Sequence, residues 1–140
     1  MAKPPMSVDL TWSEGLAFRI AAADGRISVV DGDGRAGLSP VELLAAATAS
    51  CMAVDLVHIL TKARQPLGGM HVGFTGQRAQ TEPHRFTAIR LEFAIAGRIA
   101  QAQIDRAVQL SRDKYCSVWN SLREDITLEI VTRIGADTAR

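Results

Sequence analysis

Cysteine is scarce in this chain, whose 140 residues include only Cys51 and Cys116. There is no CxxC pair, and the three histidines, His58, His71 and His84, have no paired ligand spacing. The sequence therefore predicts no metal site and no bound cofactor. The N-terminus carries no apolar signal segment, so we expect a cytoplasmic protein, in whose reducing surroundings a structural disulfide is rare.

An excess of charge of one sign is lacking as well. The chain has 16 Lys and Arg against 15 Asp and Glu, with no long basic run, so we expect no nucleic-acid partner. The longest apolar runs fall short of a bilayer span, which argues against a membrane protein. No GxSxG motif supports a serine hydrolase. The segment "DGDGRAG", residues 31–37, lacks both the Walker lysine and the EF-hand glutamate, and we interpret it as a flexible loop.

Hydrophobic residues make up 47% of the chain, which favours one globular domain over residues 1–140, with frayed ends at 1–6 and 135–140. Alternating apolar positions, with hairpin signals at Glu14-Gly15 and Asp24-Gly25, predict two or three short strands within 7–32. Further along we expect strands at 69–80 and 84–97, a helix at 100–115, a short helix at 116–124 and a strand at 126–134. This order predicts an α+β fold with mostly antiparallel sheet.

Residues 39–64 form the longest predicted helix. Ser39 is a good N-cap, Pro40 suits the first helical position, and Glu42 completes a capping box. The helix is apolar on most of its faces, and one small domain has too few elements to cover it. An intertwined homodimer with two such helices back to back would bury these faces.

Cys51 lies in the middle of this helix, where the helix dipole gives a thiolate little help. Asp55 follows one turn later on the same face, and a nearby carboxylate raises a thiol pKa. Cys51 is thus either a small core residue or a reagent. Cys116 has the same two interpretations. If it opens the short helix at 116–124, the free N–H groups there would favour its thiolate.

Two further segments are informative together: "GLSPVELLAAATASCMAVDLV" and, further along, "SRDKYCSV". This pair of segments resembles the OsmC/Ohr family of osmotically inducible and organic hydroperoxide resistance proteins. The family pattern is a Pro-x-Glu-Leu type helix start, an Ala/Gly-rich run and a cysteine, with a second cysteine after the second main helix. "KYCSV" resembles the less characterised OsmC-like branch. The resemblance implies an OsmC-like fold, with mostly antiparallel sheets around two long central helices in an intertwined homodimer.

The resemblance also implies a thiol peroxidase acting on organic hydroperoxides. Cys51 would be the peroxidatic thiolate and Cys116 the resolving thiol, and a dithiol reductant such as a lipoylated protein would reset the pair. The rival hypothesis is a non-catalytic dimer, binding a small molecule or associated with stress, in which both cysteines are packing residues.

The chain departs from the family pattern at the residues that activate the thiolate. Characterised members have a glutamate directly after the helix-start proline, paired with an N-terminal arginine, whereas here Val41 holds that position and Glu42 follows it. At about 100° and 1.5 Å per residue, Glu42 falls on the helix face opposite Cys51, about 13 Å away along the axis. Glu42 therefore cannot touch Cys51 of the same helix, and we interpret it as the capping partner of Ser39, with a role as the activating glutamate as the alternative. Arg19 and Arg35 are the two candidates for the arginine.

Overall fold

The computed structural model describes residues 2–135, which divide into two compact units at the boundary between Leu44 and Ala45. Residues 2–7 form neither helix nor strand. Residue 1 and residues 136–140, which belong to the ends expected to fray, lie outside the described residues.

The first unit is an antiparallel three-stranded sheet made of β1 (Val8–Glu14), β2 (Ala17–Ala22) and β3 (Ile27–Asp31), in that order. The predicted hairpin turns are confirmed, since Gly15 has a φ of 55° and Gly25 a φ of 94°. These positive values favour glycine, which has no Cβ. Helix α1 (Pro40–Lys62) begins at the end of this unit and continues through the second.

The predicted capping box of α1 is confirmed. The backbone N–H of Ser39 donates to Oε1 of Glu42 at 2.9 Å, and the backbone N–H of Glu42 donates to Oγ of Ser39 at 3.2 Å. This reciprocal pair satisfies N–H groups at the helix start that have no partner inside the helix.

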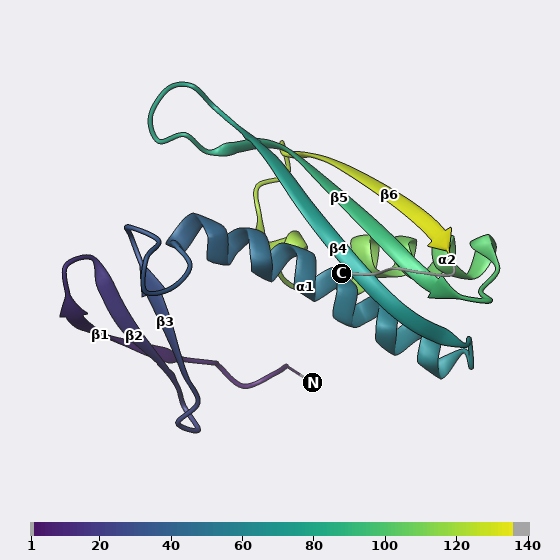
Figure 1. Cartoon of the computed structure of the whole chain (residues 1–140), viewed down its shortest axis with the longest axis horizontal. Helices are drawn as coiled ribbons and strands as arrows, with labels where there is room; N and C mark the ends of the chain where they lie inside the picture. Colours follow the sequence, from purple (N-terminus) through teal and green to yellow (C-terminus); the bar gives the residue numbers. More distant parts are fainter. Residues whose placement is uncertain (1, 136–140) are drawn as a thin grey trace. The chain divides into compact units, whose positions relative to one another are not determined.

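The second unit contains a sheet in the order β4 (Leu67–Arg78), β5 (Phe86–Gly97) and β6 (Thr127–Gly135) (Figure 1). Strands β4 and β5 pair antiparallel, as expected for a hairpin. Strands β5 and β6 pair parallel, with Ala88 opposite Thr127, so this sheet is mixed. The crossover through α2 (Gln101–Leu110) returns the chain to the same end of the sheet, which makes a parallel pairing necessary.

The helix predicted at 100–115 is only partly α-helical. Helix α2 ends at Leu110, and the next five residues form a π-helical turn, η1 (Ser111–Tyr115). The predicted short helix at 116–124 is a single 3₁₀ turn, η2 (Trp119–Ser121). The second predicted helix is thus divided at Ser111, a position important for the candidate site.

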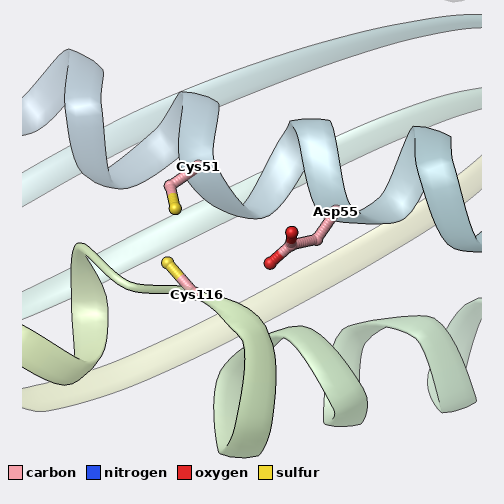
Figure 2. A group of neighbouring side chains, drawn as sticks. All are labelled: Cys51, Asp55 and Cys116. Carbon is pink, nitrogen blue, oxygen red and sulfur yellow. The ribbon is translucent and has the colours of Figure 1, made fainter. Parts of the chain in front are cut away.

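The core of the second unit lies between its sheet and its helices. Helices α1 and α2 lie on the same face of the sheet (Figures 1 and 2). One side of α1 and one side of β5 contribute most of the buried side chains, and α2, Cys116 and β6 supply others. The fully buried members include Met52, Leu56, Leu60, Ile89, Leu91, Phe93, Ile95, Ile104, Ala107 and Cys116. Their spacing follows the helix period on α1 and the two-residue strand period on β5.

The opposite side of α1 carries exposed apolar side chains. Val54 is 65% exposed and Val57 is 42% exposed. By length and composition alone α1 could also cross a membrane, a test that the core helix of a soluble protein passes as well. This corrects the expectation from the sequence that no apolar segment is long enough. Within the described part of the second unit, the exposed valines thus mark an apolar helix face that no other element covers.

Candidate functional site

Cys51 and Asp55 lie one turn apart on the face of α1 that points toward η1, and Cys116 directly follows η1 (Figure 2). The two sulfur atoms and a carboxylate oxygen of Asp55 all lie within 4.8 Å of one another. Both cysteines are free thiols. Cys51 is half-buried, whereas Cys116 is fully buried. The structure therefore brings together the two cysteines that the sequence singled out, together with the carboxylate that follows Cys51.

The π turn positions Cys116. Its backbone N–H donates to the carbonyl oxygen of Ser111 at 2.8 Å, which is the i+5 to i bond of a π-helix. In an α-helix residues five apart point about 140° away from each other. The wider turn instead places Cys116 above Ser111, so that both residues face α1. The side-chain amide of Asn120 also donates to the Cys116 carbonyl oxygen at 2.9 Å, which holds this backbone in place.

Asp55 is held by a hydrogen bond from the other helical segment. Oγ of Ser111 donates to Oδ2 of Asp55 at 2.7 Å, and Ser111 is fully buried. Within residues 2–135 Asp55 forms no ion pair, and its carboxylate is held by the hydrogen bond from the Ser111 hydroxyl. The half-buried carboxylate of Asp55 thus lies beside two thiols. It accepts a hydrogen bond from a neutral hydroxyl and has no paired cation among residues 2–135.

Burial raises the pKa of the Cys116 thiol to about 11, because desolvation penalises the thiolate. The backbone N–H of Trp119 donates to Sγ of Cys116 at 3.3 Å and lowers this pKa, but by less than burial raises it. Contact with Cys51 and the charge of Asp55 raise it further. The expected effect of helical N–H groups on the Cys116 thiolate is thus present in the Trp119 bond, but burial outweighs it.

The other predicted site residues lie in the first unit. Arg19 is on β2, paired with Thr11 and Val29, and Arg35 lies in the loop after β3. The carboxylate of Glu42 is engaged with the N–H of Ser39 in the capping box. The activating role considered for Arg19, Arg35 and Glu42 stays a prediction.

Two groups in the site were missed by sequence reasoning. In the sequence Ser111 falls at the helical spacing of Ile104, Ala107 and Val108, and a hydroxyl in such an apolar stripe needs a hydrogen-bond partner. That requirement was the available signal, and the partner is Asp55. The Trp119 N–H is a backbone group positioned by a short 3₁₀ turn, and no side-chain pattern in the sequence indicates it.

Comparison with known proteins gives consistent matches. The model of the OsmC-like protein family matches residues 31–131. Protein YhfA of Escherichia coli strain K12 is 38% identical over 125 residues, which cover 88% of this chain and 93% of that protein. A hypothetical protein from Aquifex aeolicus VF5 has a similar crystal structure, with 28% identity, a TM-score of 0.86, and coverage of 95% of this chain and 98% of that one.

An organic hydroperoxide resistance protein from Elizabethkingia anophelis shares the fold at 22% identity. Its TM-score is 0.64, and the match covers 96% of this chain and all of that one. The observed α+β architecture agrees with these matches. The chain belongs to the OsmC-like protein family.

Proposed function

We propose that this protein is a thiol-dependent peroxidase that reduces organic hydroperoxides to alcohols. One observation carries the proposal: two free thiols of unequal burial face each other, with their sulfur atoms within 4.8 Å. The shared fold with a protein described as an organic hydroperoxide resistance protein supports it. Cys51 also packs against the edge of the apolar core, which favours an organic peroxide over hydrogen peroxide.

In the first step Cys51 reacts, because it is the more accessible thiol. Its thiolate attacks one oxygen of the peroxide, an S–O bond forms and the O–O bond breaks. The alkoxide that leaves takes up a proton and departs as the alcohol. Cys51 is then a sulfenic acid, oxidised by two electrons. Cys116 does not compete for the peroxide, since it is fully buried and its raised pKa keeps it protonated at neutral pH.

In the second step Cys116 attacks the sulfur of the sulfenic acid. An S–S bond forms, the S–O bond breaks, and the hydroxide leaves as water with the proton that Cys116 gives up. The carboxylate of Asp55 lies in the same cluster and is placed to accept that proton and pass it to the hydroxide. The sulfur atoms then close to the bonding distance of about 2.05 Å.

A dithiol reductant then exchanges with the disulfide and returns both cysteines to thiols, while its own two thiols become a disulfide. A lipoylated protein is the candidate reductant, and the cytoplasm is the proposed compartment. No further cofactor takes part in these steps.

We also propose that the protein is a homodimer. The exposed apolar face of α1 around Val54 and Val57 supports this assembly, because such a face is costly to leave in water. A second copy of the chain would cover it with the same face, as a two-fold interface requires.

Stopped-flow oxidation of the reduced protein by cumene hydroperoxide tests the peroxidase proposal. We expect the wild type to react far faster than a free thiol and to lose both thiols. Cys116→Ser should react at Cys51 and stop as a sulfenic acid that dimedone traps. Cys51→Ser should be unreactive, and hydrogen peroxide should react more slowly than cumene hydroperoxide.

If the wild type reacts no faster than a free thiol, the peroxidase proposal fails, and a non-catalytic dimer with packing cysteines takes its place. The unpaired charge of Asp55 and the raised pKa of Cys116 favour that second candidate, because neither helps to form a thiolate. If Cys116→Ser forms no sulfenic acid, Cys51 is not the attacking thiol.

A further inference from the structure

The cluster of Cys51, Asp55 and Cys116 has the donor set of a site for a thiophilic metal ion. Cys51 and Asp55 present a sulfur and an oxygen from one helix face at a spacing of four residues, and Cys116 approaches from the facing segment (Figure 2). The three donor atoms lie within 4.8 Å of one another. In a tetrahedral zinc site with bonds of about 2.0–2.3 Å, the ligand atoms lie about 3.5 Å apart. The required closure is on the order of 1 Å.

Two of the three donors already have hydrogen bonds of the kind that orient metal ligands. The hydroxyl of Ser111 donates to Oδ2 of Asp55 at 2.7 Å, which leaves Oδ1 available. The N–H of Trp119 donates to Sγ of Cys116 at 3.3 Å. Such outer bonds fix ligand direction and are a regular part of metal sites. These contacts therefore support the cluster as a preorganised donor set.

The charge of the cluster also favours a bound cation. In the described part of the chain, residues 2–135, Asp55 has no cationic partner, and no ion pair includes either neighbour in the cluster. A carboxylate and two thiols in a largely apolar setting would be stabilised by a divalent cation. Two sulfur donors select a thiophilic ion such as Zn²⁺ over Mg²⁺ or Ca²⁺, which prefer oxygen.

We propose that the reduced protein binds one Zn²⁺ through Cys51, Asp55 and Cys116. Binding releases the two thiol protons, so two thiolates and one carboxylate coordinate the ion. A water molecule would supply the fourth ligand of a tetrahedral site. This site does not depend on the proposed peroxidase activity. If both hold, the metal shields the thiols, and their oxidation to a disulfide releases it.

Titration of the reduced protein with Co²⁺ and Zn²⁺ tests the site, with a phosphine reductant that does not bind zinc. We expect one Co²⁺ per chain, with the near-ultraviolet sulfur-to-cobalt absorption of a thiolate complex, and its displacement by Zn²⁺. Cys51→Ser and Cys116→Ser should each weaken or abolish this band. Asp55→Asn should weaken Zn²⁺ binding by more than about tenfold, since even the loss of an outer partner costs 10–100-fold. The exposed carboxylate variant Asp113→Asn is the matched control and should bind as the wild type does.

A second readout does not rely on a folded variant. In the wild-type protein, saturating Zn²⁺ should slow alkylation of both cysteines by iodoacetamide, whereas Mg²⁺ should not, and protein oxidised with diamide should bind no Zn²⁺. The proposal is overturned if Zn²⁺ leaves the alkylation rate unchanged, if the oxidised protein binds it equally well, or if a folded Asp55→Asn protein keeps the wild-type affinity. None of these measurements uses a peroxide, so they separate this site from the peroxidase proposal.

Discussion

Ser111 and Asp55, 56 positions apart in sequence, are joined by a 2.7 Å hydrogen bond in which the hydroxyl donates to the carboxylate. This bond connects helix α1 to the π turn that precedes Cys116. It also directs the carboxylate into the group that holds both thiols. The contact thus has two effects, one on the stability of the second unit and one on the chemistry of its cysteines.

Replacement of Ser111 by Ala should lower the free energy of unfolding by about 1–3 kcal/mol, because the Asp55 carboxylate loses its hydrogen-bond donor in a half-buried position. Urea unfolding followed by circular dichroism measures this loss. Ser50→Ala is the matched control, since its exposed hydroxyl only donates to the Ala47 carbonyl on the same helix. Equal stability of the two variants would show that the Ser111 bond contributes little.

The Cys116 thiol should remain protonated through neutral pH and ionise with a midpoint near 11, as its raised pKa requires. Thiolate absorbance at about 240 nm in Cys51→Ser, measured against the variant that also carries Cys116→Ser, isolates this titration. In this variant the midpoint should lie between 9.0 and 11, because the contribution of Cys51 to the raised pKa is lost. Adding Asp55→Asn to Cys51→Ser should move the midpoint to lower pH, since the negative charge of Asp55 raises the pKa. A midpoint at or below 9.0, the value of an unperturbed thiol, contradicts the effect of burial.

Glu42→Ala should lower the free energy of unfolding by about 0.3–1.5 kcal/mol, because the N–H of Ser39 loses its acceptor. Glu42→Gln should retain most of the stability, since its amide oxygen can accept the same bond. If Glu42 acts only as a cap, both variants should oxidise at the wild-type rate with cumene hydroperoxide. A rate loss of tenfold or more in folded Glu42→Gln would instead assign the activating role to this carboxylate.

Val54→Asp and Val57→Asp should each weaken the proposed homodimer, since either places a charge on the exposed apolar face of α1. Sedimentation velocity at low micromolar concentration should show a dimer for the wild type and a monomer fraction for the variants. Gln109→Asp, a change on the exposed side of α2, should leave the dimer intact. A wild type that sediments as a folded monomer, or that pellets with lipid vesicles, would contradict the homodimer.

Much of the fold was predictable because local signals and tertiary structure agree. The capping box of Ser39 and Glu42 predicted the start of α1, and the glycines at 15 and 25 predicted the two hairpins of the first sheet. The two-residue alternation around Leu91 and Phe93 predicted β5. In these segments the buried side chains recur at the same spacing as the apolar residues in the sequence.

The parallel pairing of β5 and β6 was not predictable from the residues, because it depends on the path of the chain through α2. The proximity of the two thiols was also not predictable from the residues. Spacing shows that Cys51 lies inside a helix, but the approach of Cys116 depends on packing between segments far apart in sequence. Resemblance to a known family supplied the pair, while the hydrogen bonds of Ser111 and Trp119 came only from the structure.

The π turn at Ser111–Tyr115 makes the site sensitive to chain length. Deleting one residue from this turn would restore the ordinary helical bond pattern and rotate Cys116 by about 100° relative to α2. The sulfur would then leave Cys51 even though both cysteines were still present. The proximity of the two sulfur atoms in this fold thus depends on the number of residues in the π turn as well as on the presence of both cysteines.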